Sequence, residues 1–279
     1  ILHQDNSAPV VSTTLQYHVG SKDEDDGLKG FAHLFEHMLG KETKNMNSGE
    51  WGKIYSARGG SGNASTSVDL TNYYVTVPSN SLKLALWRYS EIMLHPIIEQ
   101  ETIDIQREAV KEEKRLRDNQ PYVPRFYEYL KRNFFKDHPY KHPIIGYFED
   151  LDNSSLEDFL NFKEKFYAPS NAVFVVAGDI DIDETKELIS EYFNEIPFKG
   201  EKPVKNYPKE QPLTDEIRVK EYDPNIQIPA LFYAFRTPAQ SNRDSSVINY
   251  IAQYLSGSES SVLYKKLVDD KQMALGVQS

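Results

Sequence analysis

The sequence predicts an α+β fold, with a sheet covered by several helices, followed by the start of a second, related α/β domain. Three observations predict it: strand-like alternation at residues 10–19 and 64–77, a series of helix-length patterns from residue 82 onward, and a change of composition near residue 200. The chain has 279 residues, of which 39% are hydrophobic, so it is long enough to bury a core and fits about two domains.

The first domain, predicted at residues 1–198, begins with strand and helix signals in alternation. After the strand at 10–19, the acidic loop SKDEDDG offers Asp25 or Asp26 as the N-cap of the next helix. A glycine-rich stretch, RGGSGN, precedes the strand signal at 64–77. Further helices are expected at 82–94, 100–117, 121–134, 155–166 and 183–194, with a buried strand at 172–177 between the last two.

Residues 199–215 have the composition of a linker, because proline and lysine recur through them. Residues 216–279 are predicted to be the beginning of a second, incomplete domain. Its expected elements are strands at 217–222 and 230–235 and helices near 244–255 and 260–269. The order strand, polar loop, helix occurs in both domains, which predicts an internal duplication in which only the first copy carries a site.

Composition argues against several functions. The formal net charge of −10 disfavours binding to nucleic acid, which requires clustered lysine and arginine. No apolar run reaches the roughly eighteen residues that a membrane span needs. The chain has no cysteine, so any zinc ligand must be His, Asp or Glu. Because the chain begins at Ile1 as if within a strand, we expect a fragment or processed form, and its compartment stays open between bacterial periplasm and cytoplasm.

The most informative stretch is His33-Leu34-Phe35-Glu36-His37. Two histidines four residues apart lie on one face of a helix, and Glu36 falls within roughly 100° of both. Such a pair is often two hydrogen-bonded core histidines, but a glutamate at this offset favours a metal site instead. The spacing therefore predicts one zinc ion held by His33 and His37.

A catalytic zinc ion requires a third protein ligand, with water in the fourth position. The helix expected at 100–117 offers Glu108, Glu112 and Glu113. On a helical wheel Glu113 lies within the apolar arc, whereas the other two lie among lysines and arginines. A carboxylate on an apolar face is costly unless it is paired or bound to metal, which makes Glu113 the predicted ligand. Gln106, one heptad earlier on the same arc, is the predicted outer-sphere partner.

The order His-x-x-Glu-His is the inverzincin signature. The chain has FAHLFEHML around it, GSKDE before it, and GNASTSVDLTNYYVTVPSN, HPYKHPIIG, FYAPSNAVFVVAGDID and YFNEIP after it. With these stretches it resembles the family of pitrilysin, insulysin and mitochondrial processing peptidase, as the N-terminal fragment of a bacterial processing-peptidase-like member. The resemblance implies a zinc metallopeptidase in which His33, His37 and Glu113 bind zinc and Glu36 is the general base. Chemistry supports these roles, because zinc lowers the pKa of water to about 7 and a neighbouring carboxylate can accept its proton.

The resemblance also implies that the substrate, a peptide or unfolded polypeptide, adds a strand to an exposed edge opened by Asn63, Ala64 and Ser65. An ordinary hairpin strand is the alternative interpretation of these residues. His138 and His142 repeat the four-residue spacing, but the prolines beside them predict a turn rather than a second metal site.

The sequence departs from the family pattern at two positions near the site. Gly40 stands where an aromatic residue is usual, so a nearby substrate pocket is expected to differ in shape. Gln106 replaces a glutamate, which changes the outer-sphere electrostatics. Neither departure removes a predicted zinc ligand.

Family members enclose the substrate between two halves. The resemblance therefore implies a missing C-terminal half or a homologous subunit as partner, in a homo- or heterodimer, and weak or no peptidase activity of this chain alone. The alternative function is a non-catalytic peptide-binding or partner subunit that retains a structural zinc ion. A zinc hydrolase acting on other substrates ranks third, because the predicted edge strand favours extended peptides.

Overall fold

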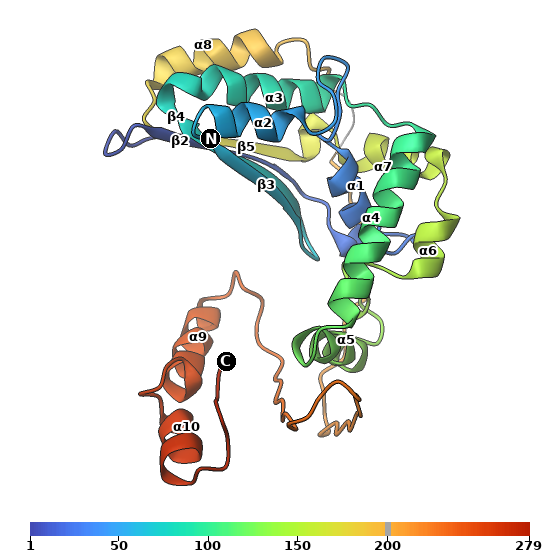
Figure 1. Cartoon of the computed structure of the whole chain (residues 1–279), viewed down its shortest axis with the longest axis vertical. Coiled ribbons are helices and arrows are strands. Elements are labelled where there is room, and N and C mark those ends of the chain that lie inside the picture. Colours follow the sequence, from blue (N-terminus) through green and yellow to red (C-terminus); the bar gives the residue numbers. More distant parts are fainter. Residues whose placement is uncertain (199–201) are drawn as a thin grey trace. The chain divides into compact units, whose positions relative to one another are not determined.

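The computed structural model describes residues 1–198 and 202–279, which divide into two compact units, Ile1–Pro229 and Ala230–Ser279. The first unit is built on a five-stranded sheet in the order β1-β5-β2-β4-β3 (Figure 1). The strands are β1 (Leu2–Gln4), β2 (Val10–Tyr17), β3 (Ser61–Thr66), β4 (Thr71–Pro78) and β5 (Ala172–Gly178). β1 and β5 are parallel and the other pairs are antiparallel. The strand order leaves β3 at one edge of the sheet.

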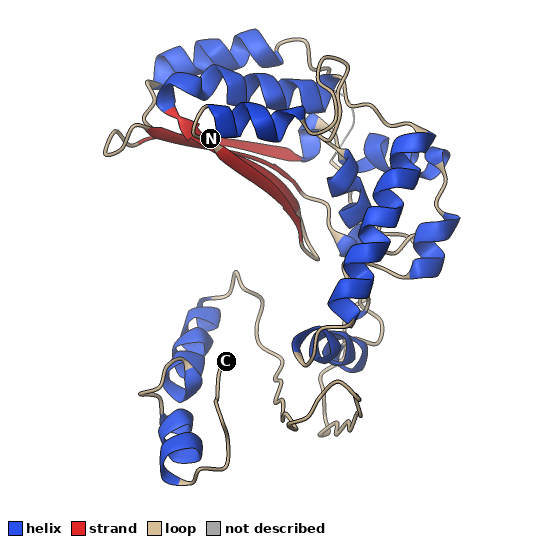
Figure 2. Ribbon diagram, viewed as in Figure 1, coloured by secondary structure: helices blue, strands red, loops and turns tan. Residues whose placement is uncertain are grey.

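Helices cover the sheet, as the sequence predicts (Figure 2). Figure 1 shows α2 (Glu50–Ala57), α3 (Leu82–Leu94) and α8 (Ile182–Phe193) along one face of the sheet. A second group of helices lies beyond one end of the strands and consists of α1 (Phe31–Met38), α4 (Gln100–Asp118), α5 (Val123–Phe134), α6 (Phe148–Asn153) and α7 (Leu156–Phe166). Among the described residues, we find no helix with both the length and the apolar character of a membrane span.

The second unit contains α9 (Arg243–Ser256) and the short α10 (Val262–Tyr264), which a π-helix extends through Lys265–Asp270. The strands predicted at 217–222 and 230–235 do not form, and this prediction is wrong. Alternating apolar residues produce the strand signal, but a strand also needs a hydrogen-bonded neighbour. The described chain forms no strand ladder over these residues, and most of their large apolar side chains are exposed.

The strand signal at 64–77 also resolves differently, into the two strands β3 and β4 of a hairpin. Ser67 makes the turn, because its hydroxyl accepts hydrogen bonds from the backbone N–H groups of Asp69 and Leu70 and donates one to the carbonyl of Leu70. The linker predicted at 199–215 includes residues 199–201, which lie outside the described residues. Beyond them, Lys205 and Tyr207 both donate hydrogen bonds to Asp23, so this part of the linker packs on the first unit.

Aromatic packing fixes the orientation of α1. Phe31 and Phe35 are fully buried on one side of this helix. The Phe31 ring stacks on Phe159 of α7 at 4.3 Å between centroids, and the Phe35 ring lies 4.2 Å from that of Tyr167. Buried aromatic side chains stabilise such contacts strongly through their large apolar area. Since these rings hold one side of α1 in the core, the other side is free to face β3 and α4.

The N-terminus of α1 is held by a buried carboxylate six residues before its N-cap. The N-cap residue is Gly30, which has a positive φ of 98° and no side chain to cap the helix. Instead, Glu24 accepts hydrogen bonds from the backbone N–H groups of Gly30 and Ala32 at 2.9 and 2.8 Å. The predicted caps, Asp25 and Asp26, are exposed and pair with lysines, so that prediction is wrong. The local sequence shows an acidic loop but does not show which carboxylate turns inward.

Replacing Glu24 with alanine should destabilise the fold. Two buried N–H groups at the start of α1 would lose their acceptor, and we expect the free energy of unfolding to fall by about 2–4 kcal/mol. Chemical denaturation of Glu24→Ala measures this change. Asp26→Ala is the matched control, because it removes an exposed acid from the same loop and should leave the denaturation midpoint essentially unchanged. Equal midpoints for the two variants would contradict the capping role of Glu24.

Candidate active site

The structure brings His33, His37 and Glu113 together. The two histidines lie one turn apart on α1, with ring centroids 4.7 Å apart. Their Nε2 atoms are each 3.6 Å from the same oxygen, Oε2 of Glu113 on α4. Among the described residues this is the one cluster of three His, Cys, Asp or Glu side chains whose ligand atoms all lie within 4.8 Å of one another.

This spacing fits a zinc ion. In a tetrahedral site with bonds of about 2.0–2.1 Å, neighbouring ligand atoms are separated by about 3.3–3.4 Å. The 3.6 Å distances between each histidine and Glu113 are close to that value, and they are longer than a good hydrogen bond. The donor set of two imidazoles and one carboxylate is also one that zinc prefers in hydrolases. The three side chains are therefore spaced to share a cation.

Helix α4 presents Glu113 somewhat differently from the helical-wheel prediction. Ile105 and Leu116, which the wheel places in the apolar arc, are 58% and 61% exposed. The buried positions are Ile103, Gln106, Val110 and Lys114, spaced three or four residues apart. Glu113 lies at the margin of this face with its side chain 35% exposed, which is where a ligand can reach both the histidines and solvent.

Gln106 lies on the buried face of α4, as expected. Within the described part of the chain, it makes no hydrogen bond to either histidine or to Glu113, and the buried Nδ1 atom of His33 has no hydrogen-bond partner. The predicted outer-sphere role of Gln106 therefore stays a prediction.

Burial keeps both histidines in the form that binds metal. Burial, together with the nearby His37 and Arg117, lowers the pKa of His33 to about 3. Burial also lowers the pKa of His37, although the charge of Glu113 acts in the opposite direction. Both imidazoles are therefore neutral at neutral pH, and neutral imidazole nitrogen is the form that coordinates a metal.

Glu36 lies beside the cluster and is held by the edge strand. Its Oε2 accepts a hydrogen bond of 2.5 Å from the hydroxyl of Thr66, the last residue of β3. Burial raises the pKa of Glu36; the hydrogen bond from Thr66 opposes this effect, and the charge of Glu113 adds to it. A carboxylate with a raised pKa suits proton transfer near neutral pH. Thr66 has no assigned role in the sequence analysis, because its contact spans thirty residues and leaves no local pattern.

Arg117 pairs with one of the two carboxylate oxygens of Glu113, and the histidines face the other. Its guanidinium lies 3.0 Å from Oε1, while Oε2 faces the histidines. The arginine stands four residues after Glu113, a spacing that brings the two side chains together on a helix. One carboxylate oxygen is thus directed to the histidine pair and the other is held away from it.

Asn63, Ala64 and Ser65 lie on β3, and their predicted position on an edge strand is confirmed. One side of β3 pairs with β4, and the other side has no strand partner in the described chain. Ala64 packs toward the core, whereas Asn63 and Ser65 are exposed. Thr66 is the last residue of β3 and donates its hydrogen bond to Glu36, so this end of the edge strand lies beside Glu36.

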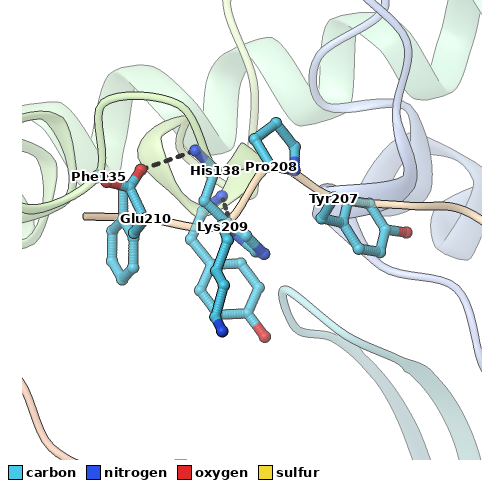
Figure 3. Close-up of a pocket in the computed structure, with 7 residues that line it drawn as sticks. Phe135, His138, Tyr207, Pro208, Lys209 and Glu210 are labelled. Atoms are coloured by element: carbon cyan, nitrogen blue, oxygen red, sulfur yellow. Dashed lines mark hydrogen bonds between the residues drawn. The ribbon is translucent and has the colours of Figure 1, made fainter. Parts of the chain in front are cut away.

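Figure 3 shows a pocket elsewhere in the first unit, and none of the cluster residues lines it. It has a volume of about 400 Å³ and is lined by Phe135, His138, Tyr140, Tyr207, Pro208, Lys209 and Glu210. Glu210 accepts hydrogen bonds from the backbone N–H groups of Asp137 and His138, both at 2.7 Å. His138 and His142 flank a short turn, Pro139–Lys141, as the prolines predict.

Comparison with known proteins places this site in a family. Residues 1–147, which contain the three clustered residues and Glu36, match the profile described as Insulinase (Peptidase family M16). Residues 153–279 match the profile described as Peptidase M16 inactive domain. The first match covers more than half of the 279 residues.

Individual relatives agree with these profiles. The zinc protease PqqE of Helicobacter pylori is 30% identical over 272 residues, which are 97% of this chain and 61% of that protein. A crystal structure of a protease from Helicobacter pylori superposes with a TM-score of 0.84 at 27% identity, covering 98% of this chain and 68% of that one. The first half of the periplasmic protease PqqL from Escherichia coli gives a TM-score of 0.68 at 25% identity, covering 75% of this chain and 46% of that one.

The chain thus spans about 61% of the length of the relative PqqE, and its resemblance to the pitrilysin and insulysin peptidases is confirmed. Both the profile match and the mixed α/β architecture lead to one assignment. This chain belongs to the insulinase family of peptidases, peptidase family M16.

Proposed function

We propose that this chain is the zinc-binding domain of a metalloendopeptidase that hydrolyses peptides or unfolded polypeptide segments. The observation that carries the proposal is the convergence of His33 and His37 on one oxygen of Glu113, with Glu36 beside them. Relatives named zinc proteases support it. In this proposal residues 1–198 are the peptidase domain, 199–215 the linker and 216–279 the start of a second, related domain.

His33, His37 and Glu113 would hold one zinc ion. A bound zinc ion supplies Lewis acidity and lowers the pKa of a water molecule to about 7. Glu36 is positioned by Thr66 to accept a proton from the attacking water and to pass it to the leaving amine of the peptide. Its raised pKa supports the first step, because a more basic carboxylate accepts a proton more readily, and a pKa closer to the working pH suits transfer in both directions.

The free edge of β3 is the proposed docking site for the substrate. An extended peptide can pair with the backbone of Asn63, Ala64 and Ser65, which gives affinity with little demand on sequence. The position of Thr66 at the end of this strand supports the proposal, because a peptide paired along β3 would run toward Glu36.

Completion by a further half or by a homologous subunit is part of the proposal, as a homo- or heterodimer. The coverage of 61% of PqqE supports it, and so does the solved first half of the larger periplasmic protease PqqL. That relative also supports a periplasmic location, with the cytoplasm as the alternative. A non-catalytic subunit with a structural zinc ion is the second candidate, favoured by the match of residues 153–279 to the inactive-domain profile.

Changing Glu36 to glutamine tests the proposed general base. We expect Glu36→Gln in the complete native protein to lose peptide hydrolysis by at least about a thousandfold, because the amide cannot accept the proton. Zinc content, measured by elemental analysis, should stay at one ion per chain, because Glu36 is not a ligand in this proposal. Wild-type hydrolysis by the variant would overturn the mechanism, and zinc-loaded wild-type protein without hydrolysis would favour the non-catalytic subunit.

Changing Glu113 to glutamine tests the third ligand. We expect its zinc dissociation constant to rise by more than the roughly 10–100-fold that loss of an outer-sphere partner causes. The matched control is Glu112→Gln, since Glu112 is the neighbouring residue and pairs with Arg115 on the exposed side of α4. Competition with a fluorescent zinc chelator measures both variants. Similar affinities in Glu113→Gln and Glu112→Gln would exclude Glu113 as a ligand.

A further inference from the structure

Arg88 on α3 is a buried cation without an anionic partner. Only 9% of the residue is exposed, and its Nε atom is buried without a hydrogen-bond partner. Among the described residues it forms no ion pair. Glu91, one turn further along α3, is also buried, but its carboxylate accepts a hydrogen bond from Asn45 at 2.9 Å and does not pair with Arg88.

Aromatic rings surround the buried part of the guanidinium. Its central carbon lies 5.9, 5.3 and 5.9 Å from the ring centroids of Trp51, Tyr55 and Tyr89. Cation–π contacts of this kind offset part of the cost of burying the charge. The rings are weak acceptors for a planar donor fork, and the buried Nε has no hydrogen-bond partner among the described residues. The aromatic cluster explains how the buried charge of Arg88 is tolerated, but it supplies no anion to pair with that charge.

Two glycines lie next to the terminal nitrogens of Arg88. A Cβ atom at Gly62 on β3 would be 3.6 Å from Nη1, and a Cβ atom at Gly40, just after α1, would be 3.7 Å from Nη2. Gly62 is exposed. The guanidinium therefore ends between the edge strand and the segment that follows the histidine helix, at a place where neither neighbour has a side chain.

The register of β3 relates Arg88 to Glu36. Side chains alternate along a strand, so Gly62, Ala64 and Thr66 share one face of β3. Thr66 donates its hydrogen bond to Glu36 at one end of this face, and Arg88 lies at Gly62 near the other end. Gly62 and Thr66 are four positions apart along the strand, a distance of about 13 Å.

We propose that Arg88 binds a carboxylate of the substrate about four residues from the cleaved bond, and so selects peptides with an acidic side chain or a C-terminus at that position. This rests on the proposed function, in which the peptide pairs along β3. A peptide paired there alternates its side chains between the two faces as β3 does, so one of them lies opposite Gly62 on the face that Arg88 occupies. The planar fork of arginine matches a carboxylate and forms paired, charge-assisted hydrogen bonds with it.

A peptide series tests this proposal in the complete native protein. Each peptide carries one glutamate at a successive position on either side of the cleaved bond and has a twin with glutamine there. A second pair ends at the selected position as a free acid or as an amide, which separates a side-chain carboxylate from a C-terminal one. Dissociation constants and kcat/KM are both measured. We expect the acidic peptide to be favoured by about tenfold or more at one position about four residues away.

Arginine variants decide whether Arg88 is responsible. Arg88→Met should abolish the preference while changing the affinity for the glutamine twin by less than about twofold. Arg88→Lys, which keeps the charge without the planar fork, should retain part of the preference and serves if the methionine variant does not fold. The matched control is Arg115→Met, which removes an exposed arginine on α4 and should keep the full preference.

The outcomes separate this inference from the function it rests on. Cleavage of both twins at equal rates with equal affinities would overturn the role of Arg88 and leave the peptidase proposal standing. An acidic preference in binding without any cleavage would support Arg88 and overturn the peptidase proposal. An acidic preference that persists in Arg88→Met would also overturn the inference.

Discussion

The hydrogen bonds between Glu24 and the start of α1 are the interaction on which the site depends. A helix that begins at a glycine in the left-handed conformation has no side chain of its own to satisfy its first N–H groups. Glu24 satisfies two of them from a position where its side chain is fully buried. The same helix carries His33, Glu36 and His37, so this contact and the aromatic packing of Phe31 and Phe35 together place all three against α4 and β3. Asp23 adjoins it and accepts hydrogen bonds from Gly20 and from Tyr207 in the linker.

The sequence selects the three residues that the structure brings together, because helix periodicity is a local property. His33 and His37 are placed by their spacing alone, and Glu113 by its position on the wheel of α4. The wheel succeeds even though Ile105 and Leu116 are exposed, since the buried residues Gln106 and Val110 lie on the same side as Glu113. Thr66 and Arg88 could not be found in this way. Their partners come from other elements, and only the folded chain brings them together.

The fold shows the same division between local and long-range information. The strands β2 and β5 have patterns long enough to read directly, and so do the helices α3, α4, α5, α7 and α8. β1 has three residues and exists because it pairs with β5 at residues far along the chain, which no short window reports. α2 contains Gly52 and is stabilised by tertiary burial of Trp51 and Tyr55 rather than by propensity. Residues 217–222 have the pattern of a strand, and in the absence of a pairing neighbour among the described residues they do not adopt it.

The two carboxylate oxygens of Glu113 face different partners, Arg117 and the histidine pair. This arrangement bears on whether the site is catalytic or structural. Structural zinc sites are closed by four protein ligands, whereas catalytic sites have three and keep one position for water. A carboxylate with both oxygens available can bind in a bidentate manner and occupy that position. Here Arg117 holds Oε1 at 3.0 Å, which leaves Oε2 alone directed to His33 and His37. The described cluster contains no fourth protein ligand, so these residues would hold a zinc ion with three ligands and leave it able to supply Lewis acidity to a water molecule. This arrangement favours the catalytic interpretation over a zinc ion retained for stability.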